Sequence, residues 1–321
     1  MSILITGVAG FIGSNLADRF IANGKTIVGV DNLCLGKLEN IKKYENESKF
    51  HFSKIDINDF EAFFEYISER NKIDPISEVW HLAANSDIPA GIANFEIDLN
   101  NTFNTTLNVL KVMQSLNLKV LYFASTSAVY GDLGNTKLTE NIGPLFPISN
   151  YGAMKLASEA LISASVESYL DKAYIFRFPN VIGTPATHGV ILDFINKLKI
   201  NNTFLDVLGN GTQQKSYLHV EELINAMFFI SNNSNEKLNY FNIGNIDEGV
   251  TVKFIAESVI EIVSPSAKIN FGLGNKGWVG DVPKFNYSID KLLNLGWKPK
   301  LNSSESIKLA ITQIYSDKYS Y

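Results

Sequence analysis

The chain has 321 residues, 45% of them hydrophobic, which is enough to bury the core of one large domain or of two domains in close contact. The formal net charge of −5 is mild and indicates neither a nucleic-acid-binding protein nor a membrane-surface protein. One cysteine excludes an internal disulfide, and four scattered histidines show no metal-site spacing. No apolar run is long enough to span a membrane, and the N-terminus does not resemble a signal peptide. We therefore expect a cytoplasmic protein without a metal site.

The first half of the chain alternates short apolar runs with helical patterns. In chain order, strands are predicted at Ile3–Thr6, Thr26–Val30, Phe50–Ile55, Glu78–Leu82 and Val120–Ala124, and helices at Ser14–Asn23, Asp59–Arg70 and Asn101–Leu116. This alternation is typical of right-handed βαβ units. The sequence therefore predicts an α/β fold with a Rossmann-type, doubly wound parallel sheet.

The second half is less regular. A long helix is predicted at Tyr151–Tyr169 and a strand at Ala173–Phe178, after which Pro179 and Pro185 interrupt the pattern. Further helices are expected near Val190–Lys199 and Thr251–Val263. We therefore expect a cofactor-binding domain in residues 1–178, and in residues 179–321 a smaller, mixed α/β substrate-binding lobe from which the chain returns to the main sheet.

The first predicted strand ends in a glycine-rich turn, Gly7-Val8-Ala9-Gly10-Phe11-Ile12-Gly13, that opens the first helix. Its glycines allow the backbone to approach a pyrophosphate, and the helix N-terminus offers free N–H groups. The second strand ends in Asp31, whose carboxylate can accept both ribose hydroxyls of an adenosine and would repel a 2′-phosphate. Each feature alone also fits an ordinary turn, but together they predict NAD rather than NADP.

Hydroxyl side chains follow the fifth predicted strand, in Ser125-Thr126-Ser127. On the next helix, Tyr151 and Lys155 are four residues apart and so share one face. A phenol has a reference pKa of about 10, but the lysine ammonium and a positive nicotinamide ring would favour the phenolate. Tyr151 is therefore a candidate general base, Lys155 a candidate ligand of the nicotinamide ribose, and Thr126 a candidate partner of the reacting oxygen.

Together these motifs resemble the extended short-chain dehydrogenase/reductases, in particular the NAD-dependent nucleotide-sugar epimerases and dehydratases, and most of all the UDP-glucose 4-epimerases. The resemblance continues through Arg177–Gly183, Gly209–Val220 and Gly280–Val282. It implies that NAD is held by Gly7, Gly10, Phe11, Ile12, Gly13, Asp31, Asn32, Leu33, Gly36, Asp56, Ile57, Leu82, Ala83, Ala84, Asn101, Ser125, Tyr151, Lys155 and Pro179. It also implies that a nucleotide-diphosphate sugar is bound by Thr126, Ser127, Tyr151, Asn180, Val190, Lys215, Tyr217 and Asp281.

The resemblance further implies a reaction at C4 of that sugar. Tyr151 would remove the proton of the 4-hydroxyl while C4 gives a hydride to NAD, and the 4-keto sugar would then turn over and take the hydride back on its other face. The family's 4,6-dehydratases carry Asp-Glu where this sequence has Ser127-Ala128, and its decarboxylases usually carry Glu at position 128. Neither reaction is therefore expected, and the resemblance predicts a 4-epimerase.

Two other interpretations stay open. A nucleotide-sugar 4-dehydrogenase or 4-keto reductase needs the same tyrosine, lysine and threonine, and a protein that only senses NAD can use the same fold. Lys215 replaces an arginine that is usual in the family and lacks its bidentate geometry, so the base and the sugar are left open. The resemblance also implies a homodimer formed through the predicted helices Asn101–Leu116 and Tyr151–Tyr169.

Overall fold

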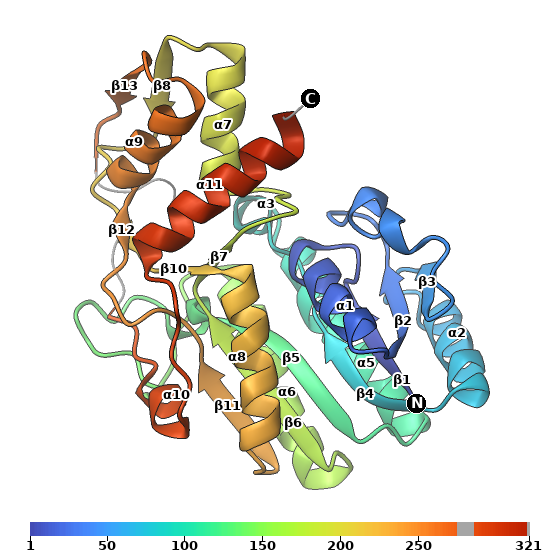
Figure 1. Cartoon of the computed structure of the whole chain (residues 1–321). Helices are drawn as coiled ribbons and strands as arrows, with labels where there is room; N and C mark the ends of the chain where they lie inside the picture. The colour runs from blue at the N-terminus through green and yellow to red at the C-terminus, as the bar shows by residue number, and fades with distance from the viewer. Residues whose placement is uncertain (275–285, 320–321) are drawn as a thin grey trace. The chain divides into compact units, whose positions relative to one another are not determined.

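The computed structural model describes residues 1–274 and 286–319, and the chain divides into two compact units. The first unit comprises Met1–Gly131, Pro144–Arg177 and Ile230–Phe241, and the second comprises Asp132–Gly143, Phe178–Phe229 and Asn242–Tyr321. Each unit is thus assembled from three separate segments of the chain, which Figure 1 colours by residue number.

The first unit is built on a seven-stranded sheet with the strand order β11-β6-β5-β4-β1-β2-β3 (Figure 1). Strand β1 pairs in parallel with both β2 and β4, and β2 with β3 and β4 with β5 are parallel as well. The strand order reverses between β1 and β4, which is the switch point of a doubly wound sheet. The predicted Rossmann-type fold is therefore confirmed. The strands are β1 (Ser2–Thr6), β2 (Thr26–Asp31), β3 (Phe50–Lys54), β4 (Ile76–His81), β5 (Val120–Thr126), β6 (Lys172–Phe178) and β11 (Leu238–Asn242).

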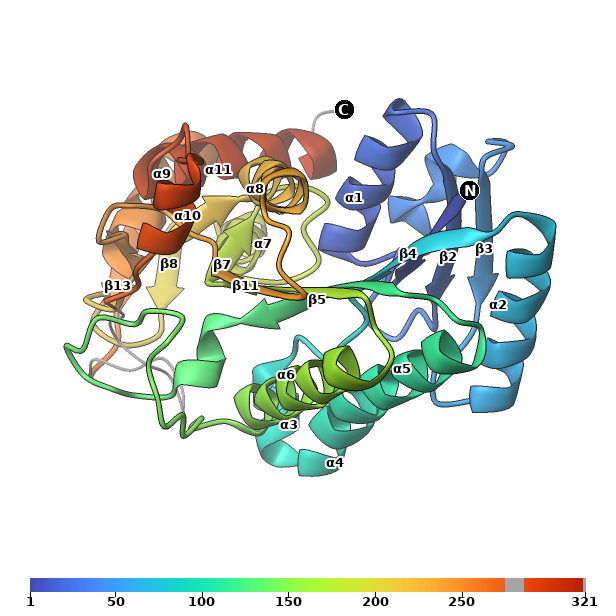
Figure 2. The ribbon, with the colours of Figure 1, turned by 90° about the horizontal axis from the view of Figure 1, so that it is seen from below.

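Helices cover both faces of this sheet (Figure 2). Helix α1 (Phe11–Ala22) lies on one face, while α2 (Phe60–Ile73), α5 (Thr105–Ser115) and α6 (Asn150–Ser168) lie on the other. Side chains of these three helices, such as Phe63 and Met113, form one buried cluster with the strands. Apolar residues at helical spacing on α2, α5 and α6 thus explain how these helices cover this face of the sheet. Shorter helical pieces of the unit are η1 (Leu38–Asn40), η2 (Lys42–Tyr44), α3 (Ile88–Ala93) and η4 (Ser127–Tyr130).

The helix predicted at Asn101–Leu116 is present, but its first turn is not α-helical. The chain forms α4 (Phe95–Asp98), then a π-helical turn, η3 (Leu99–Asn104), and only then α5. The carbonyl oxygen of Asn101 accepts hydrogen bonds from the amide of Asn85 at 3.0 Å and from the hydroxyl of Thr105 at 3.3 Å. Such competing donors draw carbonyls out of the regular ladder, which explains why the predicted helix begins with a π-helical turn.

On the α1 face, aromatic side chains stack across neighbouring strands. The rings of Trp80 and Tyr122 are 4.0 Å apart and nearly parallel, and the rings of Tyr122 and Tyr174 are 4.6 Å apart. Phe20 of α1 meets Trp80 edge-on at 5.5 Å. Stacked and edge-to-face pairs add to the free energy gained by burying the rings, so this ladder ties β4, β5 and β6 to one another and to α1.

The second unit contains short strands and longer helices. Helices α7, α9 and α11 enclose a second buried cluster that includes Ile195, Val259 and Ile311. In the described part of this unit, β7 pairs with β10, β9 with β12, and β8 with β13. The elements are β7 (Asn180–Ile182), α7 (Val190–Ile200), β8 (Phe204–Val207), β9 (Gln214–Lys215), β10 (Tyr217–His219), β12 (Val250–Thr251), α9 (Val252–Val263), β13 (Lys268–Phe271), α10 (Asp290–Leu295) and α11 (Ser303–Tyr319), with α8 (Val220–Asn233) running into the first unit.

Candidate active site

The glycine turn between β1 and α1 leaves room for the close approach of another group. Gly7 has a φ of +71°, and a Cβ on Gly13 would lie 2.1 Å from the carbonyl oxygen of Gly7. Helix α1 begins at Phe11, and its N-cap, Gly10, has no side chain to bond the first helical N–H groups. Ile12 lies in the same first turn, so all five predicted residues are together. The turn can hold an anion such as a pyrophosphate.

Asp31 is fixed at the end of β2 by two backbone amides. Its carboxylate accepts from Ala9 N at 3.0 Å and from Leu33 N at 2.8 Å, and the side chain is almost fully buried. Burial raises the pKa of Asp31, while these two hydrogen bonds act in the opposite direction. Gly36 passes so close that a Cβ there would lie 2.8 Å from either carboxylate oxygen. Because each oxygen has further lone pairs, the carboxylate can still accept ribose hydroxyls.

Replacing Asp31 by alanine should weaken NAD binding more than NADP binding. The change removes an acceptor for the ribose hydroxyls and the repulsion of a 2′-phosphate, and it frees two backbone amides that hold the turn. Isothermal titration of both cofactors measures the ratio of their affinities. Asp18→Ala, which removes an exposed carboxylate of α1 paired with Lys43, is the control. An unchanged ratio in Asp31→Ala would show that Asp31 only supports the turn.

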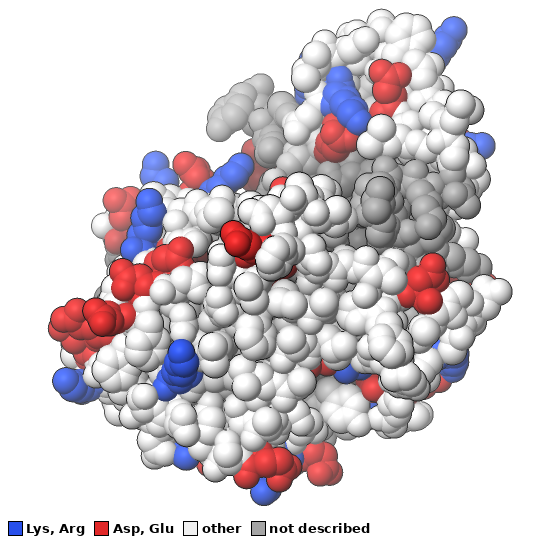
Figure 3. Space-filling view, turned by 180° about the vertical axis from the view of Figure 1, so that it is seen from behind, with Lys and Arg blue, Asp and Glu red and all other residues white. Residues whose placement is uncertain are grey.

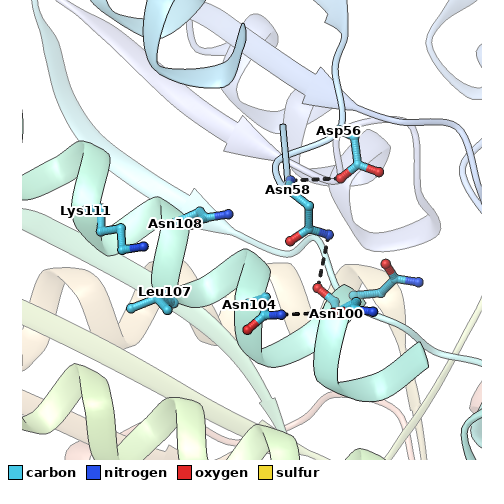
Figure 4. A pocket seen from close by; sticks show the side chains of 8 residues that line it. Asp56, Asn58, Asn100, Asn104, Leu107, Asn108 and Lys111 are labelled. Atoms are coloured by element: carbon cyan, nitrogen blue, oxygen red, sulfur yellow. Dashed lines mark hydrogen bonds between the residues drawn. The ribbon is translucent and has the colours of Figure 1, made fainter. Parts of the chain in front are cut away.

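A polar pocket opens beside the ends of β2 and β3 (Figure 4). Asp56 follows β3 and accepts from Asn32 Nδ2 at 3.1 Å, while Ile57 O accepts from Asn108 Nδ2 at 3.1 Å. Asn101, from the π-helical turn, shares the pocket with Asp56, so these predicted cofactor residues lie together. The pocket has a volume of about 510 Å³ and is lined by Asp56, Asn58, Asn100, Asn101, Asn104, Leu107, Asn108 and Lys111.

The segment after β4, Leu82-Ala83-Ala84, passes directly against the glycine turn. A Cβ on Gly7 would lie 2.8 Å from Ala83 N, and that amide donates to the hydroxyl of Thr6 at 3.3 Å. Leu82 N donates to the carbonyl oxygen of Thr6 at 3.2 Å. The small side chains therefore let two strand ends meet where the strand order reverses, which is where doubly wound sheets bind ligands.

His81, the last residue of β4, is a buried neutral link. Its ring nitrogens make hydrogen bonds to the hydroxyls of Thr6 at 2.7 Å and Thr106 at 3.1 Å. Burial, together with the nearby Lys155, lowers the pKa of His81 to about 3. The histidine therefore joins β1, β4 and α5 and carries no charge at neutral pH.

Tyr151 and Lys155 lie on α6 and face the end of β5. Lys155 is 3% exposed, and its Nζ donates to the carbonyl oxygen of Ala124 at 2.6 Å. The side chain of Thr126 accepts from Ala128 N at 3.1 Å and makes a hydrogen bond with the Tyr151 hydroxyl. The structure thus brings together the three side chains that the sequence predicts for proton transfer, and Ser127 follows them in η4.

The protein groups alone hold this tyrosine protonated. Burial raises the pKa of Tyr151 to about 12, the hydrogen bond with Thr126 opposes this, and the charge of Asp98 adds to it. Burial lowers the pKa of Lys155 to about 7, against the opposing charges of Glu159 and Asp98. The phenolate expected near neutral pH therefore depends on the positive nicotinamide ring as well as on the lysine.

A buried ion pair that we did not predict lies next to Lys155. Glu159 and Arg177 meet at 2.6 Å with less than a tenth of either side chain exposed. Ser125 Oγ donates to Glu159 Oε1 at 2.5 Å, so the hydroxyl of this predicted cofactor residue is already engaged. Arg177 Nη1 donates to the Tyr130 hydroxyl at 3.0 Å. The sequence held one signal for this pair, because Glu159 stands four residues after Lys155 and so shares its helix face.

Asp98, at the end of α4, is a second carboxylate missed by sequence reasoning. It is fully buried, and its Oδ1 accepts from Asn85 Nδ2 at 2.8 Å. Its Oδ2 has no partner among the described residues and lies where a Cβ on Gly91 would be 1.9 Å away. No local pattern marks this residue, because its partner Asn85 stands before α3, in a different segment.

The substrate residues predicted from the resemblance lie mostly in the second unit. Asn180 in β7 is paired with Tyr217 in β10, and Asn180 Nδ2 donates to Ser216 O at 3.5 Å. Lys215 lies in β9, just before β10. Val190 begins α7 and packs against the buried cluster that contains Tyr217. Pro179 precedes β7, and Asp281 lies outside the described residues, so Asn180, Lys215 and Tyr217 form the described core of this group.

The residues described here contain no group of three or more His, Cys, Asp or Glu side chains placed to hold a metal ion. None of their helices is both long and apolar enough to cross a membrane.

Tyr151→Phe keeps the ring and removes the hydroxyl that meets Thr126. General acid–base catalysis is typically worth about 10²–10⁴-fold in rate, so turnover should fall by that amount while the cofactor stays bound. Steady-state rates on the sugar nucleotide that the wild-type protein converts, with the cofactor content of the purified protein, measure both. Tyr169→Phe, at the other end of α6, where the hydroxyl donates to Leu110 O, is the control. Near-normal turnover in Tyr151→Phe would place the base elsewhere.

Comparison with known proteins agrees with this geometry. Residues 3–244 match the model of the NAD dependent epimerase/dehydratase family. A protein of Methanocaldococcus jannaschii named as a candidate UDP-glucose 4-epimerase is 29% identical over 96% of this chain and 97% of its own length. A UDP-glucuronate 4-epimerase of Thermodesulfobacterium geofontis is 28% identical over 96% and 94%. A crystal structure of a UDP-galactose 4-epimerase superposes with a TM-score of 0.86 and 31% identity, covering 99% of this chain and 100% of that one.

Proposed function

Because the chain belongs to the NAD-dependent epimerase/dehydratase family, whose cofactor is NAD, we propose that it is a nucleotide-sugar 4-epimerase. The observation that carries this proposal is that α6 places Tyr151 and the buried Lys155 against the end of β5, where Thr126 lies and where Lys155 donates to Ala124 O at 2.6 Å. These groups can move a proton to and from a sugar hydroxyl. The family's 4,6-dehydratases carry an acid and a base at the positions of Ser127 and Ala128, so this site lacks the groups for loss of water.

The first unit fits NAD. Its glycine turn has no room for side chains at Gly7 and Gly13, α1 offers free N–H groups, and the Asp31 carboxylate is fixed at the end of β2. When bound, NAD supplies a reversible hydride acceptor next to the sugar. Tyr151 takes the proton from the 4-hydroxyl and later returns one, Thr126 orients the reacting oxygen, and Lys155 holds the nicotinamide ribose and favours the phenolate.

The second unit supplies the proposed contacts to the nucleotide. Asn180 and Lys215 would bind the diphosphate, and Val190 and Tyr217 would line the nucleotide pocket. Lys215 carries a point charge and lacks the bidentate geometry with which an arginine binds phosphate. This difference allows a substrate other than UDP-glucose. The relatives reported above are themselves named for different UDP-sugars. A panel of UDP-, GDP-, CDP- and dTDP-sugars would identify the base and the sugar.

The direct test of the proposal follows the stereochemistry at C4. The purified protein is incubated with UDP-glucose, UDP-N-acetylglucosamine, UDP-glucuronate and the rest of the panel, with no free NAD added. We expect one substrate to reach an equilibrium mixture of 4-epimers without accumulation of NADH. Stoichiometric reduction of the bound NAD with no epimer from any sugar would instead favour the alternative function, a nucleotide-sugar 4-dehydrogenase or 4-keto reductase that uses the same three side chains.

We also propose that the protein is a homodimer formed through α5 and α6. These helices lie side by side on one face of the sheet, and Figure 3 shows few charged side chains over the middle of that face. Ala157 and Leu161, one turn apart on α6, are both partly exposed. Ala157→Glu with Leu161→Lys should shift the mass measured by sedimentation to that of a monomer, whereas charges placed on α2 should not. A monomeric wild-type protein would contradict this proposal. A cytoplasmic location stays a prediction.

A further inference from the structure

Three side chains of α6, each one turn after the last, contact the end of β5. Tyr151 makes a hydrogen bond with Thr126, Lys155 donates to Ala124 O at 2.6 Å, and Glu159 accepts from Ser125 Oγ at 2.5 Å. Residues four apart lie above one another on a helix. The three contacts therefore set the position of α6 along β5. The first two contacts are made by Tyr151 and Lys155, the proposed proton-transfer groups.

The Glu159 carboxylate, which makes the third contact, is itself bound by an arginine. Arg177 in β6 donates to Glu159 through Nε at 3.0 and 3.2 Å and through Nη2 at 2.6 Å. The same guanidinium donates to the Tyr130 hydroxyl at 3.0 Å and lies 5.1 Å from the centre of that ring. Tyr130 is fully buried at the end of η4, the short helix that follows Thr126. Glu159 and Arg177 thus hold both sides of the turn that carries Thr126.

Stability alone is a poor reason for such a pair. Removing two charges from water costs much of what their attraction returns, and apolar residues of similar volume often serve the fold equally well or better. An ion pair with a fixed, bidentate geometry does, however, hold its partners at defined positions. The Ser125 hydroxyl is the group so held, and it lies between the two residues that meet Lys155 and Tyr151.

We propose that Glu159 is a positioning residue for the reaction: backed by Arg177, it anchors Ser125 and thereby keeps Ala124 on Lys155 and Thr126 on Tyr151. The proposal rests on the proposed function for its kinetic test, because that function assigns proton transfer to Tyr151. It adds a role for three buried residues, Ser125, Glu159 and Arg177, that act through Ala124 and Thr126.

The charges around Lys155 and Tyr151 make this positioning measurable. Glu159 on α6 and Asp98 on α4 both raise the pKa of Lys155, and the neutral His81 of β4 also lies within its influence. The hydrogen bond with Thr126 lowers the pKa of Tyr151, whereas Asp98 raises it. If the anchor is lost, Lys155 loses a favourable charge and Tyr151 loses its hydrogen bond. Both changes move the ionisation of Tyr151 to higher pH.

The kinetic experiment compares variants that keep the fold by different routes. Ser125→Ala removes the anchored hydroxyl and leaves the ion pair intact. Glu159→Leu combined with Arg177→Met removes both charges, so that neither is left unpaired in the core. Ser165→Ala, further along α6, removes a buried hydroxyl that donates to Leu161 O at 2.9 Å and is the control. A misplacement of about 1 Å in an active site can cost about 10²-fold in rate. We expect kcat to fall by about that much in the double variant, with its KM, NAD content and melting temperature nearly unchanged, and to fall less in Ser125→Ala.

A second measurement does not depend on any substrate. Ultraviolet difference titration of the NAD-loaded protein, with and without Tyr151→Phe in each background, reports the ionisation of Tyr151. It should move to higher pH in Ser125→Ala and in the double variant but not in Ser165→Ala. Folded variants with unchanged kcat and unchanged titration would overturn the proposal and leave the pair a purely structural role. If no sugar nucleotide reacts even with the wild type, the proposed function fails. The titration still decides whether Glu159 positions Tyr151 and Lys155.

Discussion

The burial of the Lys155 ammonium is the constraint on which the candidate active site depends. A cation that is 3% exposed needs polar or charged partners, because its transfer out of water is costly. The Ala124 carbonyl supplies a hydrogen bond, and Glu159 and Asp98 supply opposite charge. Glu159 is itself buried and needs Arg177 in turn. One buried lysine thus accounts for a chain of contacts that fixes α6 against β5 and β6.

The fold could be predicted from the sequence because its signals are local. Each apolar run of the first half became a strand within two residues of the expected ends, and the glycine turn opens α1 as expected. The helix expected at Asn101–Leu116 formed, but its first turn is π-helical for a non-local reason. Asn85, which lies in the segment after β4, donates its amide to Asn101 and interrupts the ladder. A periodic pattern cannot show such a donor, because the donor lies outside the helix.

The candidate site divides in the same way. Thr126, Tyr151 and Lys155 could be found because their spacing on one strand end and one helix is visible in the sequence. Glu159 shares that spacing and was still missed, since its importance appears only when Arg177 arrives from β6. The protonation of Tyr151 also needed the structure. Spacing places a lysine beside it, but burial raises its pKa to about 12, a physical effect that no motif records.

The two units therefore contribute different groups to the proposed reaction. The groups proposed to move or position a proton, from Thr126 at the end of β5 to Arg177 at the end of β6, lie in the first unit. These groups are equally suited to epimerisation and to oxidation or reduction at C4, because each of those reactions begins or ends with the same proton. The groups proposed to grip the nucleotide, such as Asn180 and Lys215, lie in the second unit. Whether a 4-keto sugar turns over or leaves depends on how firmly the nucleotide is held while the sugar is free. In the proposed reaction, the second unit would therefore decide the outcome, and the first unit would carry out the proton transfer.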